Sequence, residues 1–442
     1  MRMLVLRLVK KVGTSTRCLV LLMVVVCMPF VYLALNNVHT SKRPVKVAVS
    51  DTLGGGSILQ RYLTDAPAQH TAVGERFAQR RRHLQDQCAD LPSYFGTQNS
   101  ENAVKEHLTI DTKHNLVYCA IEKIGSTFWK RVYQILSGFK NVSDPFEIQG
   151  IRAYEGYLTA KGLPFDRIHY ILKNSKKFMF VREPYERLLS GYVDKLFAPN
   201  AAYWAFIGTF ITQTFRANAT EEAKKCGHDV TFEEFVLYFI YSQHNNLRRD
   251  AHFVPNFEHC RPCEIDYEYI GKLETFKEDT LFLLKELQLD SEVRFTDFQT
   301  ETERDAIVDA ADYVYSMQKA ITKCMSMHEA LFRCYRKLQI RGIISTDVEY
   351  PFIREGERDI SIEEYKRNLL TAHAHSGPPE SRKSNRREAF IEAYSTLSAD
   401  VLLKLTNELS VDAKLFDYEL VPKAFEKIEN YKPEFSFFHI HL

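Results

Sequence analysis

Hydrophobic positions along the chain take on a regular period shortly after residue 106. Residues 116–121, LVYCAI, form a short apolar run that is typical of a buried strand. A polar loop, EKIGS, follows. Apolar side chains then recur at steps of three and four residues, as on one face of a helix; they are Trp129, Val132, Tyr133, Leu136 and Phe139. The pattern predicts a strand, a loop and an amphipathic helix in succession.

The same succession recurs further along the chain. Residues 178–181, FMFV, predict a second buried strand, and the turn REP at residues 182–184 leads into a second amphipathic helix. Strands that alternate with helices predict an α/β fold, in which helices flank a central parallel sheet. Ligands of such sheets bind at the C-terminal ends of the strands, beside helix N-termini. Residues 231–242 predict a further helix, and residues 265–276 a strand and a turn.

An uncharged apolar run occupies residues 18–35. It is about as long as the roughly 20 residues that cross a bilayer, and basic residues precede it: Arg2, Arg7, Lys10, Lys11 and Arg17. Basic residues before a span favour a cytosolic N-terminus, which would make the rest of the chain lumenal. A cleaved signal peptide is the alternative, but no A-x-A-like site follows the run. We expect a retained signal anchor.

These patterns divide the chain into six parts. We predict a cytosolic tail (1–17), a transmembrane anchor (18–35), a lumenal stem (36–105), a catalytic core (106–299), a partly irregular insertion (300–390) and a C-terminal part of the same domain (391–442). The stem has no sustained period, and its basic run at residues 80–82 is expected to be a solvated face of a short helix.

Composition adds little to this division. The formal net charge is +1, and 26% of the residues are charged. No global field therefore attracts polyanions, and no nucleic-acid partner is expected. A nucleotide or an acidic glycan would have to bind through local clusters of basic residues.

The cysteines and sequons agree with a lumenal address. Two of the nine cysteines lie in the apolar run, which leaves an odd set of seven, so at least one thiol is free or pairs between chains. Cys260 and Cys263 form a CxxC motif, but no second pair completes a zinc site, and structural disulfides are expected. The sequons at Asn141 and Asn218 predict N-glycosylation.

Two loops carry the candidate chemistry. In the first loop, residues 122–127, Lys123, Ser126 and Thr127 stand before a predicted helix N-terminus, a combination that suits a phosphate or a sulfate. A solvent-exposed lysine is the plainer alternative. In the second loop, residues 182–184, Arg182 ends a strand and Ser190 follows two helical turns later. A guanidinium there suits a phosphate monoester, although an arginine taken alone more often forms an ion pair with a carboxylate. Two such loops predict a ligand with two anionic groups.

At this point the motifs resemble a known family, the Golgi carbohydrate sulfotransferases. YCAIEKIGSTFWKR (118–131) resembles their 5′-phosphosulfate loop, KFMFVREPYERLLSGYVDKL (177–196) their 3′-phosphate motif, and DAHFVPNFEHCRPCEIDYEYIGKLET (250–275) a segment of the branch with chondroitin and dermatan 4-O-sulfotransferases and HNK-type enzymes. The resemblance implies a fold related to P-loop kinases. It also implies the donor 3′-phosphoadenosine 5′-phosphosulfate and no metal. The implied donor-binding residues are Lys123, Ile124, Gly125, Ser126, Thr127, Lys130, Arg182 and Ser190.

The resemblance implies a type II Golgi membrane enzyme that sulfates a hydroxyl of a glycosaminoglycan or a glycoprotein glycan. A chondroitin- or dermatan-like N-acetylgalactosamine 4-hydroxyl is the expected acceptor, and a homodimer is compatible with it. The chain departs from the family at Glu122, where proline is usual, and at Phe253, where tryptophan is usual. Residues 300–387 have no good family counterpart.

Candidate catalytic residues follow from the chemistry of sulfuryl transfer. Lys123 is suited to stabilise charge on the departing phosphate, and His252 to accept the proton of the acceptor hydroxyl. A structural histidine is the alternative for His252, and His244 and Glu258 are second choices for the base. Arg248 and Arg249 would bind a uronate or a sulfate of the acceptor, unless they form a solvated basic turn.

Two other functions remain open from the sequence. One is a non-catalytic lumenal glycan-binding protein that keeps the fold, which Glu122 and the insertion leave possible. The other is a P-loop-type phosphotransferase. The absence of G-x-x-x-x-G-K-[ST] and of a clear magnesium carboxylate disfavours it.

Overall fold

The computed structural model describes residues 56–90, 104–245, 249–295, 297–352, 359–429 and 431–439. The chain divides into two compact units, Met1–Thr64 and Asp65–Leu442. The described part of the first unit is the beginning of helix α3 (Gly56–Asp90), and all that follows concerns the second unit. Across the described ranges, no helix combines the length and the apolar character that a membrane span requires. The predicted tail and anchor lie outside these ranges.

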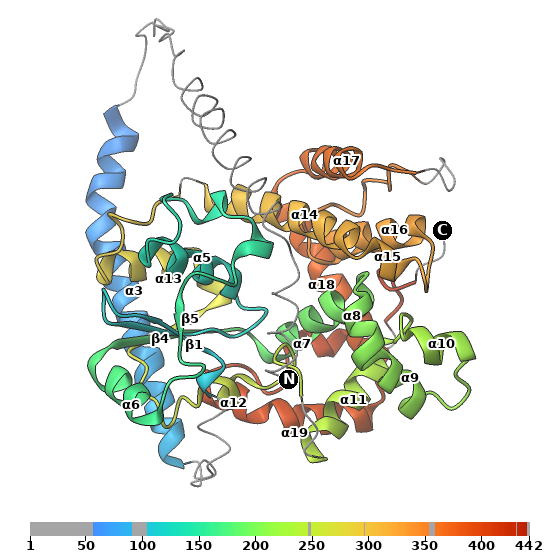
Figure 1. Ribbon diagram of the computed structural model, residues 1–442, viewed down its shortest axis with the longest axis horizontal. Coiled ribbons are helices and arrows are strands. Elements are labelled where there is room, and N and C mark those ends of the chain that lie inside the picture. Colours follow the sequence, from blue (N-terminus) through green and yellow to red (C-terminus); the bar gives the residue numbers. More distant parts are fainter. Residues whose placement is uncertain are drawn as a thin grey trace, which may run out of the picture. The chain divides into compact units, whose positions relative to one another are not determined.

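A five-stranded sheet forms the centre of one part of this unit (Figure 1), in the order β3-β1-β2-β4-β5. Its strands are β1 (Leu108–Asp111), β2 (Leu116–Cys119), β3 (Leu158–Thr159), β4 (Lys176–Val181) and β5 (Tyr269–Lys272). The predicted α/β class is confirmed, but the sheet is mixed and not wholly parallel. β2, β4 and β5 are parallel, whereas β1 pairs antiparallel with β2 and β3. The connection between β1 and β2 is a short turn, which only antiparallel neighbours can use.

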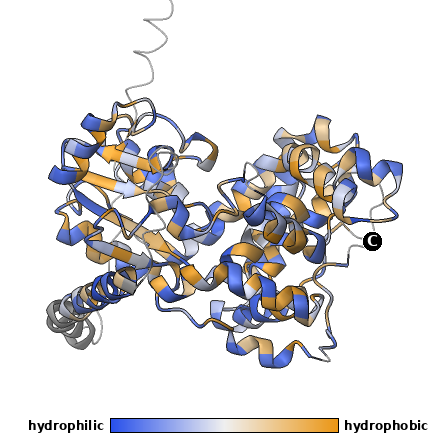
Figure 2. Cartoon of the chain, turned by 90° about the horizontal axis from the view of Figure 1, so that it is seen from below, coloured by the Kyte–Doolittle hydropathy of each residue, from blue (hydrophilic) through white to orange (hydrophobic). Residues whose placement is uncertain are grey.

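The two strands foreseen from their apolar runs lie next to each other in this sheet. Every residue of β2 is buried, as is all of β4 after its first residue, and Figure 2 shows hydrophobic residues concentrated on the strands. Helix α5 (Ser126–Leu136) packs Trp129 against β4, with its ring centroid 4.6 Å from that of Phe178. Trp129 is therefore a core residue and not a ligand-binding one, as its helical spacing indicates. Helices α6 (Phe165–Asn174) and α13 (Phe276–Glu286) contribute to the same core.

The remaining helices bury two further apolar clusters. The first lies between α7 (Pro184–Tyr192), α11 (Phe232–His244), α18 (Pro379–Ser395) and α19 (Ala399–Leu415). The second lies between α14 (Phe298–Ser316), α16 (Met327–Ile340) and α17 (Ile362–Ala374). The shorter elements are α8 (Ala201–Tyr203), α9 (Thr209–Phe215), α10 (Glu221–Cys226), α12 (Asn256–Cys260), α15 (Gln318–Ile321), η2 (Pro145–Glu147), η3 (Gly150–Arg152), η4 (Val193–Phe197), η5 (Trp204–Gly208), η6 (Leu273–Thr275) and η7 (Lys423–Lys427).

Two features of these helices position the site. Helix α7 continues without a break into η4, a π-helical turn, and such turns are frequent at functional sites. Helix α16, within the segment predicted as an insertion, packs against η4 and α18. The insertion segment is thus largely helical where the structure describes it.

Helix α3 brings the basic run of residues 80–82 against the core. Arg76 and Arg80 pair with Asp279 at 2.6 and 2.7 Å, and the carboxylate of Asp279 is fully buried. Arg81 pairs with Asp266 at 2.6 Å. The expectation of a solvated face is therefore wrong for Arg80, since a buried carboxylate requires paired cations, whereas Arg81 and its partner Asp266 are both accessible to solvent. The limits of the predicted stem stay a prediction.

Three disulfides connect distant elements, and they are Cys88–Cys263, Cys119–Cys260 and Cys226–Cys324. The prediction that the CxxC cysteines form structural disulfides is confirmed, with each cysteine bonded to a different element. Cys334 is a free, buried thiol, as the odd number of cysteines requires.

Candidate active site

The first loop leaves the end of β2 in an unusual backbone conformation. Lys123 and Gly125 have φ values of +70° and +74°, in the left-handed region. Gly125 caps helix α5, and a Cβ atom there would lie 2.6 Å from the ring of Phe276, so only glycine fits. Ile124 is completely buried, so its side chain contributes to the core.

The Lys123 side chain meets a carboxylate that the sequence analysis did not identify. Its Nζ lies 2.8 Å from Oδ2 of Asp194, which η4 carries. Nζ of Lys195 lies 3.3 Å from the same oxygen, and Nζ of Lys337 lies 2.5 Å from Oδ1. Burial alone would raise the pKa of Asp194, but these three lysines hold it well below its ordinary value.

Lys123 itself is poised between its two protonation states. Burial, together with the charges of Lys195 and Lys337, outweighs Asp194 and lowers the pKa of Lys123 to about 7. A bound anion would restore the charge of this ammonium, because an opposite charge favours the protonated form. The lysine thus responds electrostatically to an anionic ligand.

The other residues of the first loop lie around the start of α5. Ser126 is buried and Thr127 is half-buried. Nζ of Lys130 lies 3.9 Å from Oε1 of Glu122 and 4.7 Å from the ring centroid of Tyr154. Glu122 therefore faces Lys130 and not Lys123.

The second loop contacts the first directly. Nη1 of Arg182 donates to the carbonyl oxygen of Lys123 at 3.4 Å, and Nη2 donates to Oε2 of Glu186 at 2.8 Å. Arg386 on α18 donates from Nε to the same Glu186 oxygen at 3.0 Å. Arg182 is buried, and its Nε has no partner among the described residues. The ion pair considered as an alternative for Arg182 therefore exists, beside a buried N–H group that has no hydrogen-bond partner among the described residues. Ser190 lies half-buried further along α7.

A buried arginine, which the sequence analysis also missed, connects the first loop to the segment of the candidate base. Arg187 donates to the carbonyl oxygens of Glu122, Val254 and Ala251 at 3.1, 2.7 and 3.2 Å. Burial lowers its pKa to about 10, so it stays charged at neutral pH. The sequence offered a signal, since Arg187 is the second arginine of the R-x-P-x-x-R motif.

His252 forms a triad with an acid and a phenol. Its Nδ1 lies 2.6 Å from Oδ1 of Asp250 and 3.0 Å from the hydroxyl of Tyr203, which donates to Oδ2 of Asp250 at 3.1 Å. Desolvation lowers the pKa of His252 below its ordinary value, although Asp250 opposes the shift. With Nδ1–H donated to Asp250, the neutral ring presents a free lone pair on Nε2.

A chain of contacts connects this triad to Lys123. Nζ of Lys195, which pairs with Asp194, also lies 5.0 Å above the ring of Tyr203. Lys195 is among the charges that lower the pKa of His252. Lys123 and His252 therefore belong to one electrostatic neighbourhood.

The remaining candidates near the base are otherwise engaged. Arg249 is paired with Glu258, to which its Nη1 donates at 2.9 Å, so a uronate would have to displace that carboxylate. Nε2 of His244 lies 2.7 Å from Glu408. Arg248 lies outside the described residues. The asparagines of both sequons, Asn141 and Asn218, are exposed, as glycosylation requires.

One group of side chains has the composition of a metal site. Ligand atoms of His107, Glu122 and His259 lie within 4.8 Å of one another. However, Nε2 of His259 lies 2.6 Å from the carbonyl oxygen of Ala251, a distance that requires a proton on this nitrogen. Arg187 and Lys130 add positive charge nearby. A cation would have to displace that proton against this charge, so the group is not a ready metal site.

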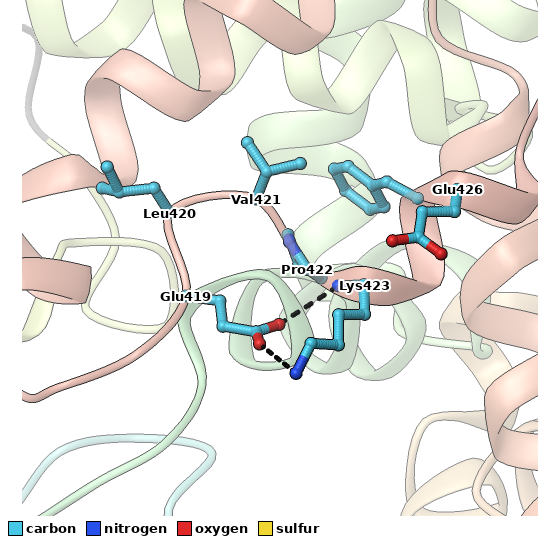
Figure 3. Close-up of a pocket in the computed structure, with 7 residues that line it drawn as sticks. Glu419, Leu420, Val421, Pro422, Lys423 and Glu426 are labelled. Atoms are coloured by element: carbon cyan, nitrogen blue, oxygen red, sulfur yellow. Dashed lines mark hydrogen bonds and ion pairs between the residues drawn. The ribbon is translucent and has the colours of Figure 1, made fainter.

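A pocket of about 610 Å³ lies in the closing segment, lined by residues 419–423, 425 and 426 (Figure 3). Its polar groups include Glu419 and Lys423, which form an ion pair at 2.9 Å. None of the predicted donor or catalytic residues lines it.

Comparison with known proteins agrees with this geometry. The sequence model of the sulfotransferase family matches residues 106–335, which include both loops and the His252 segment. The chain belongs to the sulfotransferase family. Its family match ends inside α16, so Lys337 and Arg386 lie beyond it.

Curated sulfotransferases resemble the chain over about half of its length. It is 37% identical to carbohydrate sulfotransferase 11 of Rattus norvegicus over 202 residues, which are 45% of this chain and 57% of the relative. Identity to carbohydrate sulfotransferase 8 of Homo sapiens is 32% over 233 residues, which are 52% and 54% of the two chains. Identity to carbohydrate sulfotransferase 11 of Danio rerio is 33% over 257 residues, which are 56% and 72%. The match thus spans little more than half the length of the first two relatives. No solved structure matches the chain significantly.

Proposed function

We propose that this sulfotransferase-family chain is a carbohydrate O-sulfotransferase that uses 3′-phosphoadenosine 5′-phosphosulfate. The observation that carries the proposal is the contact between the two loops, in which Arg182 donates to the carbonyl of Lys123. One continuous basic site there can take a ligand with two anionic groups. The relatives named as carbohydrate sulfotransferases support a sugar acceptor.

The residues around the loops fit such a donor. Arg182 is cationic, and Lys123 regains its full charge when an anion binds. Gly125 lets the backbone of the first loop approach closely, and the N-terminus of α5 points its unpaired N–H groups into the loop. The buried Nε–H of Arg182 is an unpaired donor that an anionic oxygen could satisfy. Ser126, Thr127, Lys130 and Ser190 complete the set of proposed donor-binding residues.

Each catalytic residue has a separate task in the proposed mechanism. The bound donor supplies the sulfuryl group, and Lys123 stabilises negative charge on the phosphate that departs. Nε2 of His252 accepts the proton of the attacking hydroxyl, while Asp250 and Tyr203 fix the ring and its tautomer. Arg187 binds the carbonyl oxygens of Glu122 and Ala251 and so fixes the first loop relative to the segment that contains His252.

For the acceptor we propose a chondroitin- or dermatan-like N-acetylgalactosamine 4-hydroxyl, on the strength of the motif resemblance. For the compartment we propose the Golgi lumen, with the chain anchored by residues 18–35 as a type II membrane protein. Three disulfides support an oxidising compartment, because cytosolic proteins rarely hold such bonds.

The test uses the full chain in detergent, ³⁵S-labelled donor and a panel of desulfated glycans. We expect label in chondroitin or dermatan and binding of 3′-phosphoadenosine 5′-phosphate by calorimetry. A chain that binds neither the donor nor 3′-phosphoadenosine 5′-phosphate does not have the proposed sulfotransferase activity. A chain that binds the nucleotide but labels no glycan would be the non-catalytic glycan-binding protein considered above.

A further inference from the structure

Three basic residues of the donor site come from helices beyond the family match. Lys337 lies on α16 and Arg341 follows its last turn, whereas Arg386 lies on α18. Lys337 and Arg341 are four residues apart, a spacing that places two helical side chains on one face. Both helices belong to the segment whose sequence predicted only an insertion.

Lys337 meets the first loop through a shared carboxylate. Asp194 binds Lys123 through Oδ2 and Lys337 through Oδ1, so the two ammonium groups lie on either side of one carboxylate. Asp194 remains partly accessible, with 22% of its side chain exposed. An anion that approaches Lys123 therefore also approaches Lys337.

Arg386 is likewise connected to Arg182 of the second loop through a shared carboxylate, that of Glu186. Oε2 of Glu186 accepts hydrogen bonds from both Arg182 and Arg386. Burial would raise the pKa of Glu186, but the two guanidinium groups hold it below its ordinary value. Because 48% of the Arg386 side chain is exposed, a ligand can contact it from solvent.

Arg341 lies within electrostatic range of both carboxylate clusters. Within the described ranges, its guanidinium makes no hydrogen bond and no ion pair; the residue as a whole is exposed, although burial around the guanidinium lowers its pKa below the ordinary value. The charges that act on it include Asp194 of the first cluster and Arg182 and Arg386 of the second. The proximity of three guanidinium groups is an excess of positive charge that a bound anion would offset.

The charges around the two loops are unbalanced. Among the described residues, six cations (Lys123, Lys195, Lys337, Arg182, Arg341 and Arg386) surround two carboxylates, Asp194 and Glu186. Glu183, Glu274 and Asp309 act on the site's arginines from further away. Burial raises the pKa of Glu183 to about 7, which reduces its negative charge near neutral pH, and that of Asp309 to about 6, which leaves this carboxylate mostly ionised.

We propose that Lys337, Arg341 and Arg386 bind the anionic groups of the donor nucleotide together with Lys123 and Arg182. Lys337 contacts the 5′-phosphosulfate beside Lys123, and Arg341 and Arg386 contact the 3′-phosphate beside Arg182. Asp194 and Glu186 hold these cations together while no nucleotide is bound. The inference rests on the proposed function and extends its donor site to the C-terminal helices.

The test measures nucleotide binding by the full chain in detergent, by calorimetry at constant ionic strength. The probes are 3′-phosphoadenosine 5′-phosphate and adenosine 5′-monophosphate, which lacks the 3′-phosphate. We expect Arg341→Ala and Arg386→Ala to weaken the bisphosphate about 10- to 100-fold and to leave the monophosphate unchanged, while Lys337→Ala weakens both. Arg386→Lys, which keeps the charge, restores part of the affinity.

Matched controls are Lys383→Ala and Arg387→Ala, which remove exposed charges from the same helix α18. If the wild type does not bind the bisphosphate, the proposed function itself fails. If it binds and the three variants behave like the controls, only the present inference fails. Unchanged nucleotide affinity with a raised KM for an anionic glycan would assign these residues to the acceptor and also overturn it. An equal loss of affinity for both nucleotides in Arg386→Ala would also overturn the inference.

Discussion

At the scale of single residues, the site depends on carboxylates that fix cations. Asp194 holds Lys123 at 2.8 Å, and Asp250 holds Nδ1 of His252 at 2.6 Å. Each acid thereby fixes the position and favours the charge or tautomer of a group that the proposed reaction uses. The two acids lie on different elements, η4 and the loop before α12, and the contact of Lys195 with Tyr203 joins them.

Lys123→Ala is the most direct test at this scale. Because the proposed role of the ammonium is to stabilise charge that develops on the departing phosphate, we expect its loss to lower kcat about 100- to 1,000-fold. Single-turnover transfer of ³⁵S from bound donor measures this step. Lys161→Ala is the control, since that exposed lysine pairs with Glu106 away from the site. Activity within about threefold of the wild type would remove Lys123 from the mechanism.

The pH dependence of transfer follows from His252 and Lys123. His252 must be neutral to accept a proton, so kcat/KM rises with pH through a pKa below the ordinary histidine value of about 6.5. Lys123 in the free protein has a pKa of about 7, so donor binding takes up protons and kcat/KM falls above that pH. The expected profile is a bell with its maximum near these values.

Two variants test whether His252 is responsible for the acidic limb of this pH profile. His252→Ala retains binding of 3′-phosphoadenosine 5′-phosphate and loses the acidic limb along with most of the rate. Asp250→Asn removes the carboxylate that raises the pKa of His252, so the acidic limb shifts to lower pH. An acidic limb that stays in place in both variants would point to another base.

At the scale of elements, the strand–loop–helix units decide where the cations lie. The two loops follow the C-terminal ends of β2 and β4, which are neighbouring parallel strands. Arg182 therefore lies close enough to donate a hydrogen bond to the carbonyl oxygen of Lys123. The sharp turn into α5 depends on Gly125 and on the ring of Phe276 beside it.

Substitution of Gly125 tests this dependence. Gly125→Ala is unfavourable for two reasons: alanine is strained at the left-handed φ, and its Cβ atom would lie 2.6 Å from the ring of Phe276. Gly138→Ala is the matched control, because Gly138 has a φ of +73° but no atom within 4 Å of its Cβ position. We expect about 1–2 kcal/mol of destabilisation for the control, and about 1–3 kcal/mol more for Gly125→Ala. Urea unfolding measures both, and equal losses would show that Phe276 does not restrict the loop.

How far the sequence predicted these elements depends on how local each signal is. The continuous apolar runs of β2 and β4 and the periodic helices behind them were recognisable, and so were the residues of both loops. β1 and β3 were missed because their sequences, LTID and LT, contain no continuous apolar run. Asp194 had a readable signal, since it follows Ser190 by one helical turn. Lys337, Arg341 and Arg386 had none, because their place depends on how α16 and α18 pack against η4.

At the scale of the molecule, disulfides and buried ion pairs hold distant segments on the sheet core. Cys88–Cys263 closes the widest interval among the described disulfides, with a sequence separation of 175, and it connects α3 to the segment after α12. Arg76 and Arg80 connect the same helix to Asp279. A part of the chain outside the family match, which begins at residue 106, is thereby part of the folded unit.

The double variant Cys88→Ser/Cys263→Ser tests the contribution of this bond. Loop-closure entropy predicts a loss of about 5 kcal/mol in the free energy of unfolding, since the denatured chain regains the freedom of a long loop. The control is Cys334→Ser, which changes a buried free thiol and opens no loop. Urea unfolding of the full chain in detergent, with the other two disulfides intact, compares them. Because the salt bridges to Asp279 remain, we expect α3 to stay docked and nucleotide binding to persist below the unfolding transition. A double variant as stable as Cys334→Ser would mean that the ion pairs alone hold α3 on the core.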